Sequence, residues 1–245
     1  MEIELSSITP DAVFDGGDLD CGSGLILLIR ENMLKVPTNG ILEMRSRERT
    51  VGDDLPSWCR MSGHAFLGRL TAEGHTRYFV RKGDTAKKEE ENLKKDKEAA
   101  KKYEWRLRAR STGHLKSSIY TRNFSFDMGQ AASFEEKDAH PCAVEYLFAA
   151  LAGSLSTGFA TECARESLEV DDIELSLTGT LHNILAHTGL EHGDPSVKQI
   201  ELKCFASTFD DEEKVRAAWQ KTVDRSPIAS TLKKAVDLQL KLVFV

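Results

Sequence analysis

The cysteines are the first candidates for chemistry, because a thiolate is both a nucleophile and an oxidisable group. The chain of 245 residues contains five cysteines, Cys21, Cys59, Cys142, Cys163 and Cys204. Their number is odd, no pair is spaced C-x-x-C, and a chain of this length does not need a disulfide framework. We therefore expect reduced thiols and no metal site built from cysteine.

Cys21 lies where a short strand turns into a helix, in the run LDCGSGLILLIR from Leu19 to Arg30. A helix N-terminus lowers the pKa of a thiol and so favours the reactive thiolate. Two glycines follow Cys21 in this turn, Gly22 and Gly24, and they loosen its backbone. A functional Cys21 and an incidental one both remain open.

Two serines could also do chemistry, and Ser154 is a possible hydrolase nucleophile. It lacks a G-x-S-x-G elbow, and no histidine is placed by local spacing to activate it. Ser226 precedes Pro227, which is the pattern of a helix N-cap followed by proline at the first helical position. A structural role accounts for each serine: Ser226 suits a helix cap, and Ser154 suits close helix packing as a small residue.

Three histidines, His182, His187 and His192, recur five residues apart and suggest a metal site. Five is not a helical repeat, and Gly193-Asp194-Pro195 is typical of a turn. We interpret them as loop histidines and expect neither a metal nor a cofactor.

The elements that must position these residues form an α+β protein in three parts. Residues 1–82 alternate strand and helix and predict a small two-layer β/α sandwich. Residues 83–102 are almost free of apolar side chains and carry acid-before-base pairs four apart, which predicts a solvated helical linker. Residues 103–245 predict strands around a few helices, with one strand from Leu115 to Met128 and a long helix from Pro141 to Ser167.

The long helix has two stripes. Leu147, Leu151, Leu155 and Phe159 form a bulky ridge, and Ala150, Ser154, Gly158 and Thr161 form a ridge of small residues suited to a core or a dimer seam. Its apolar run from Tyr146 to Thr161 is shorter than the ~20 residues of a membrane span, so a buried core helix is expected.

Composition sets further limits. The chain is 40% hydrophobic and 29% charged with a net charge of -6, so we expect neither nucleic acid nor a membrane as partner. The acidic start from Met1 to Leu5 has no secretory pattern, which favours the cytoplasm.

The C-terminal part resembles the OsmC/Ohr family of thiol peroxidases. The stretch VEYLFAALAGSLSTG from Val144 to Gly158 is similar to the family's central-helix pattern E-x-L-x-x-A-x-A-x-C, and RSPIASTL from Arg225 to Leu232 resembles its C-P-x-x-x-x-L signature. The resemblance implies a homodimer in which one cysteine attacks an organic hydroperoxide and a second resolves it. Glu145 would match the active-site glutamate, Ser154 the peroxidatic cysteine and Ser226 the resolving one. The family's arginine has no match, since Ser133-Phe134 stands in its place.

The N-terminal part resembles the TusA/SirA family of sulfur carriers. Its marker is L-x-C-P-x-P at the same strand-to-helix turn, and the stretch from Asp54 to His64 is also similar. The resemblance implies that Cys21 accepts a sulfane sulfur as a persulfide and passes it to a sulfur-relay partner, although both family prolines are glycine here.

These observations predict a cytoplasmic sulfur-handling or redox-associated protein. Cys21 is its candidate sulfur acceptor, and its OsmC-like domain has lost peroxidase chemistry, because a serine hydroxyl cannot form a sulfenic acid or a disulfide. Two alternatives stay open. One is an organic hydroperoxide reductase that uses Cys142 or Cys163, and the other is a non-catalytic scaffold with an apolar pocket under Glu145 for a small lipid-like molecule or a protein.

Overall fold

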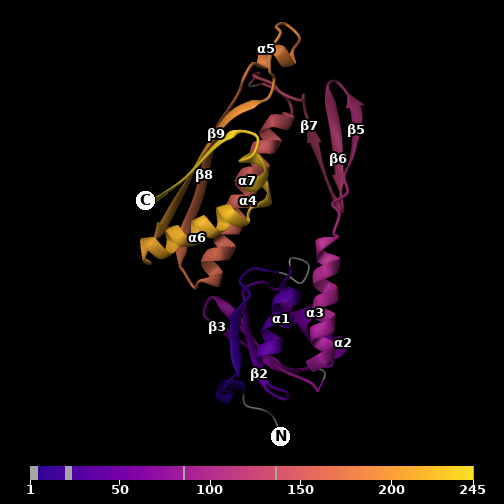
Figure 1. The fold of residues 1–245 in the computed structure, drawn as a ribbon, viewed down its shortest axis with the longest axis vertical. Coiled ribbons are helices and arrows are strands. Elements are labelled where there is room, and N and C mark those ends of the chain that lie inside the picture. Colours follow the sequence, from indigo (N-terminus) through magenta and orange to yellow (C-terminus); the bar gives the residue numbers. More distant parts are fainter. Residues whose placement is uncertain (1–4, 20–23, 85, 136, 245) are drawn as a thin grey trace. The chain divides into compact units, whose positions relative to one another are not determined.

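The computed structural model describes residues 5–19, 24–84, 86–135 and 137–244. It separates into two compact units, Met1–Tyr103 and Glu104–Val245. Figure 1 shows the elements of each unit. Both units contain helices packed on mainly antiparallel sheets, so the protein is α+β as predicted.

The first unit is one four-stranded sheet with helices on it. Its elements are η1 (Leu5–Ser7), β1 (Ala12–Asp15), α1 (Leu25–Lys35), β2 (Ile41–Ser46), α2 (Val51–Ser62), β3 (Ala65–Ala72), β4 (His75–Arg81) and α3 (Ala86–Lys101). The strand order is β1-β2-β4-β3, with β1 and β2 parallel and the other pairs antiparallel.

The core of this unit forms where α1 and α2 cover one sheet face. Every fourth residue of α1 (Leu25, Ile29 and Met33) is fully buried, and these side chains meet Leu42 and Val80 of the sheet. α2 begins at Val51, and so Pro56 lies inside the helix. Asp53 and Asp54 in its first turn favour a start at this point through the helix dipole.

The charged segment forms the predicted helix, α3, but it is not a free linker. α3 belongs to the first unit and packs along α1. Leu93, its one buried side chain among those described, is 6% exposed. About one turn further along α3, two ion pairs join it to α1: Arg30 with Asp96 at 2.9 Å and Lys97 with Glu31 at 3.3 Å. Most of the other described side chains of α3 are exposed, so the helix is solvated except where Leu93 and these ion pairs hold it against α1.

The second unit contains the long helix and two sheets. Its elements are β5 (Arg108–Gly113), β6 (Lys116–Thr121), β7 (Phe124–Met128), α4 (Ala143–Arg165), β8 (Val170–Leu181), α5 (Ile184–His187), β9 (Val197–Thr208), α6 (Glu212–Arg225), α7 (Pro227–Leu232) and β10 (Asp237–Phe244). One sheet has the order β10-β9-β8, with β10 parallel and β8 antiparallel to β9, and the other is the meander β5-β6-β7.

The meander corrects the prediction of one strand from Leu115 to Met128. Thr121 pairs with Phe124, so a two-residue turn divides the segment into β6 and β7. Arg122 in that turn has a φ of 51°, a left-handed conformation that its residue type does not signal. β7 contacts α4 where the ring of Phe126 lies 5.1 Å from that of Tyr146, whose hydroxyl donates a hydrogen bond to the Asp127 carbonyl at 2.6 Å.

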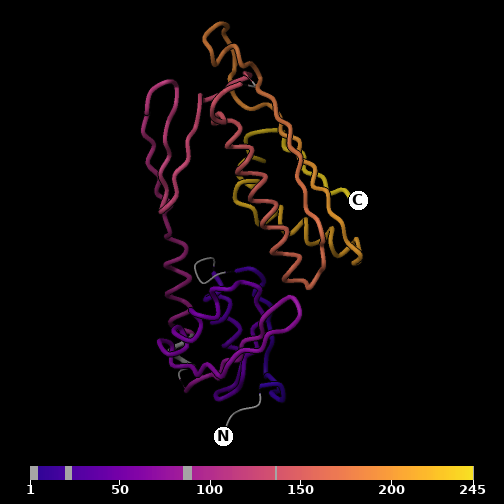
Figure 2. The backbone as a smooth tube through the Cα atoms, turned by 180° about the vertical axis from the view of Figure 1, so that it is seen from behind, coloured from indigo at the N-terminus to yellow at the C-terminus, as the bar shows by residue number. Residues whose placement is uncertain are grey.

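α4 is the central helix of this unit, and it lies along the β8–β9–β10 sheet with α6 and α7 beside it (Figures 1 and 2). Its bulky ridge is in the core as predicted, with Leu151, Leu155 and Phe159 fully buried. α4 extends beyond both ends of the apolar run from Tyr146 to Thr161. At 23 residues it has the length and composition of a membrane span, a test that the core helices of soluble proteins also pass.

The small-residue ridge of α4 receives another helix at Gly158. A Cβ atom built on Gly158 would lie 3.1 Å from Cγ2 of Thr222 on α6, closer than side chains normally pack. The two helices therefore approach closely at this point because residue 158 has no side chain.

Candidate functional site

The two serines that the sequence resemblance aligns with the redox cysteines of the OsmC/Ohr family are in direct contact. Ser154 lies in the middle of α4, and Ser226 ends α6 and caps the N-terminus of α7. Their Oγ atoms are 2.8 Å apart, which is a hydrogen bond in which either hydroxyl can be the donor. The cap is the one predicted from Ser226-Pro227, since the Ala229 N–H donates to Ser226 Oγ at 3.1 Å.

In the part of the chain that the structure describes, no base is placed to activate either serine hydroxyl as a nucleophile. Among the described residues, the two hydroxyls bond to each other and to the Ala229 N–H, and no histidine or carboxylate accepts a proton from either. Ser226 is 4% exposed. A serine without a base stays protonated, so the pair has no activated oxygen.

A group of charged side chains that sequence reasoning missed lies beside the serine pair. The carboxylate of Glu162 is buried and accepts a hydrogen bond from Nη1 of Arg225 at 2.6 Å, and Nη1 of Arg165 lies 3.6 Å from the same oxygen. Arg225 is next to Ser226 in the chain, but it is 63 residues from Glu162. The only available signal was the presence of Glu162 two turns beyond Ser154 on the same helix.

These residues surround a cavity of about 280 Å³. Its lining comes from the second half of α4, the end of α6 and the start of α7: Ser154, Thr157, Gly158, Thr161, Glu162, Arg165, Thr222, Arg225, Ser226 and Pro227. We call it the serine cavity.

Glu145 is not part of the serine cavity. It is the third residue of α4, nine residues before Ser154, which corresponds to about 13 Å along a helix. Its carboxylate accepts a hydrogen bond from the Cys142 N–H at 2.6 Å, while the Cys142 side chain accepts one from the Glu145 N–H. The two residues form a capping box that stabilises the start of α4.

A second cavity of about 300 Å³ lies at this end of α4, and we call it the Glu145 cavity. Its lining is mostly apolar or small: Ala132, Ser133, Cys142, Val144, Glu145, Phe148, Gly179, Thr180, Leu181 and Ile184. Gly179 makes room for the ring of Phe148 in the cavity wall, because a Cβ at position 179 would overlap that ring. The pocket expected under Glu145 therefore exists.

The described cysteines differ in environment. Burial raises the pKa of Cys59 and Cys204 to about 12 and that of Cys163 to about 11, where the neighbouring Glu162 adds to the effect. Cys142 is 2% exposed and lines the Glu145 cavity. Cys21 lies outside the described residues, and the first residue described after it, Gly24, precedes α1 with a φ of 99°.

The three histidines lie around the short helix α5. His187 ends α5, and Asn183 caps its start by accepting from the Leu185 N–H at 2.9 Å. Over the part of the chain that the structure describes, no three His, Cys, Asp or Glu side chains are grouped as metal ligands.

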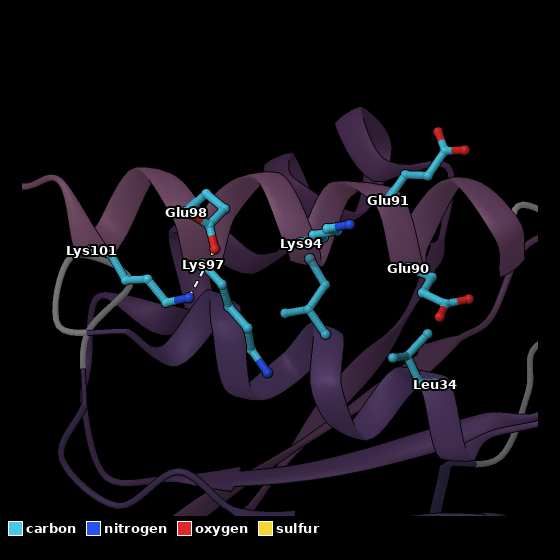
Figure 3. Close-up of a pocket in the computed structure, with 8 residues that line it drawn as sticks. Leu34, Glu90, Glu91, Lys94, Lys97, Glu98 and Lys101 are labelled. Carbon is cyan, nitrogen blue, oxygen red and sulfur yellow. Dashed lines mark hydrogen bonds and ion pairs between the residues drawn. The ribbon is translucent and has the colours of Figure 1, made fainter.

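A third hollow, in the first unit, is a groove of about 670 Å³ along α3. Figure 3 shows Leu34 of α1 below it and the charged side chains of α3 around it. Three glutamates and three lysines line the groove, so their charges cancel: Glu90, Glu91, Glu98, Lys94, Lys97 and Lys101.

Comparison with known proteins gives a different relative for each unit. A family model described as OsmC-like protein matches residues 136–241. The OsmC-like protein from Mycoplasma pneumoniae superposes with a TM-score of 0.51 at 12% identity, over 59% of this chain and 99% of that one, which shows a shared fold.

The other relatives are sulfur carrier proteins TusA. The one from Pseudomonas putida (strain GB-1) is 26% identical over 78 residues, which are 32% of this chain and 96% of the relative. The one from Pseudomonas syringae pv. tomato is 26% identical over 82 residues, 34% of this chain and 96% of the relative. The chain thus combines an N-terminal TusA-like region with a C-terminal OsmC-like domain.

Proposed function

We propose that this is a cytoplasmic sulfur-handling protein in which Cys21 carries the sulfur and the OsmC-like domain binds rather than catalyses. The observation that carries the proposal is the contact between Ser154 and Ser226, whose hydroxyls are 2.8 Å apart where a peroxidase of this fold would need two thiols. Oxygen at both positions forms neither a sulfenic acid nor a disulfide.

The sulfur step at Cys21 needs a thiolate and a persulfide donor. The Cys21 thiolate attacks the outer sulfur of the donor, the donor's S–S bond breaks, and the donor leaves as a thiolate while Cys21 becomes a persulfide. A thiolate on a relay partner then takes the same sulfur and regenerates Cys21. The TusA relatives support this role for the region.

Three of the other thiols are poorly suited to the step. Cys59, Cys163 and Cys204 have pKa values raised to about 11–12 by burial, so almost none of each is thiolate at pH 7. Cys163 is therefore also a weak candidate for the alternative of a hydroperoxide reductase.

Persulfide mass spectrometry on the full chain tests the proposal. After incubation with an inorganic polysulfide, wild type gains one sulfur on the peptide that contains Cys21, and Cys21→Ala gains none. Cys142→Ser is the matched control, because it removes a thiol but keeps an acceptor at the helix cap. Equal sulfur loading of wild type and Cys21→Ala would remove the carrier role.

We also propose that the OsmC-like domain forms a homodimer. One side of α4 is open in the single chain, with Ala149, Ala150 and Ala160 exposed, and the meander exposes Phe124 at 54%. A second copy of the same surface would cover these apolar groups. Light scattering should give twice 27.3 kDa, and a monomer at micromolar concentration would contradict the proposal.

The Glu145 cavity supports a second candidate function, the binding of a small lipid-like molecule. Its apolar walls and volume of about 300 Å³ match the lower end of ligand pockets. Native mass spectrometry of the purified protein should show a retained apolar ligand that is lost in Gly179→Leu, whose side chain would displace the ring of Phe148 from the cavity wall. Lys95→Leu, at an exposed position of α3 in the first unit, is the control.

A further inference from the structure

The serine cavity holds an excess of positive charge. Arg165 and Arg225 each contribute a guanidinium, and Glu162 contributes the only carboxylate in the lining. Glu162 is buried and interacts with both arginines through one oxygen. With two guanidinium groups and one carboxylate in its lining, the cavity has a formal net charge of about +1.

The cavity also has hydrogen-bond donors to spare. Only one of the two serine hydroxyls can donate within the pair, and Ser226 already accepts from the Ala229 N–H. Whichever serine donates, the other hydroxyl proton has no acceptor among the described residues. Arg225 uses Nη1 for Glu162, and its side chain is 61% exposed, so its other N–H groups can reach a ligand.

We propose that the serine cavity binds a small carboxylate with a single negative charge. Such an anion neutralises the excess charge, and its two oxygens accept from an arginine fork and a serine hydroxyl together. A dianion would leave a net negative charge next to the buried Glu162. The volume of about 280 Å³ is close to the lower end of ligand pockets and favours a small ligand.

This inference deepens the binding role proposed above for the OsmC-like domain and gives that role a ligand class. It rests on the absence of thiol chemistry at Ser154 and Ser226, and it does not involve Cys21. The ligand is held by charge and hydrogen bonds and undergoes no reaction.

The test is a titration of the isotope-labelled full chain with sodium acetate, at constant ionic strength and pH 7, followed by the amide and arginine Nε–H signals in NMR spectra. We expect saturable shifts of signals from α7 and from the second half of α4. Acetamide is the matched neutral probe and should cause no saturable shift. Sulfate should bind more weakly than acetate.

Three variants locate the site. Arg225→Gln should weaken acetate binding about tenfold or more, and Ser154→Ala should weaken it several-fold without removing a charge. Arg216→Gln is the control, because Arg216 is on the same helix and pairs with Glu212 outside the cavity. If Arg225→Gln fails to fold, Ser154→Ala and Arg165→Gln answer the same question.

Two results would overturn the inference: acetamide that binds as well as acetate, or acetate affinity that is the same in wild type, Arg225→Gln and Ser154→Ala. Repeating the titration on Cys21→Ala separates the two proposals. If Cys21→Ala binds acetate as well as wild type does, the carboxylate site does not depend on Cys21. A failure of sulfur loading then says nothing against the carboxylate site, and a failure of acetate binding says nothing against sulfur loading.

Discussion

Ser154 Oγ and Ser226 Oγ form a 2.8 Å hydrogen bond between helix α4 and the junction of α6 and α7. The bond joins residues 72 positions apart and places two side chains of cysteine size within reach of each other. The backbone therefore holds positions 154 and 226 at a separation that would suit a dithiol pair.

The double variant Ser154→Cys/Ser226→Cys should form an intramolecular disulfide. Two Cβ atoms that hold their oxygens 2.8 Å apart need only a small rotation to give an S–S bond of about 2.05 Å. Thiol titration of the denatured protein should find two more thiols than wild type after reduction, and no more than wild type after mild oxidation. Each single variant is a control that must keep its extra thiol, and a double variant that also keeps both would contradict the prediction.

Ser226→Ala should destabilise the second unit by about 1–2 kcal/mol. The change removes the acceptor for the Ala229 N–H and the partner of Ser154, both inside the protein. Thermal unfolding should show a lower midpoint for this variant. Ser230→Ala, on the same helix, should be close to neutral, and an equal loss in both variants would show that the cap contributes little.

Glu43 should make the stability of the first unit depend on pH. Its carboxylate is 1% exposed, and hydrogen bonds from Arg77 hold its pKa below the usual value, against the cost of burial; Arg45 adds to the effect. A lowered pKa means that the stabilisation is complete above the unfolded pKa of about 4.3 and is lost as pH falls through the folded one.

Glu43→Gln should therefore reduce the opening free energy of β2 and β4 by about 1–3 kcal/mol at pH 7, as measured by amide hydrogen exchange. The difference between variant and wild type should shrink at pH 3. Glu73→Gln, in the exposed turn between β3 and β4, should show no such pH-dependent loss. A constant difference at both pH values would exclude Glu43 as the cause.

Leu93→Ala should release α3 from α1. The side chain is the buried anchor of the helix, and its loss should cost about 2 kcal/mol of local stability. Amide exchange in the described part of α3 should then speed up while exchange in the sheet stays unchanged. Lys95→Ala, which removes an exposed side chain, is the control. In Leu93→Ala, α3 should exchange faster at high salt than at low salt, because salt screens the ion pairs that Asp96 and Lys97 make with α1.

Sequence reasoning succeeded where one residue pattern decided one element. The four-residue spacing of Leu151, Leu155 and Phe159 predicted the buried side of α4, and Ser226-Pro227 predicted the start of α7. Helix periodicity and caps depend on neighbours in the chain, so they can be read without knowledge of the fold.

Sequence reasoning failed where a contact joins residues far apart in the chain, and where a residue adopts a conformation that its type does not favour. Glu162 and Arg225 meet only when α4 packs on α6, and Arg122 turns the chain with a φ that its side chain does not favour. Glu145 matched a family position, yet its local contact is a helix cap with Cys142, which the sequence did not suggest because cysteine is an uncommon capping residue.

The missing side chain at position 158 has a consequence for how this domain can change. A methyl group at 158 would meet Thr222 at 3.1 Å, four residues before Ser226 on the same stretch of chain. Any larger residue would force α6 outward by a few tenths of an ångström or more, and Ser226 would move with it. Gly158 therefore helps to set the distance between positions 154 and 226, although it takes no part in the hydrogen bonds of the serine pair.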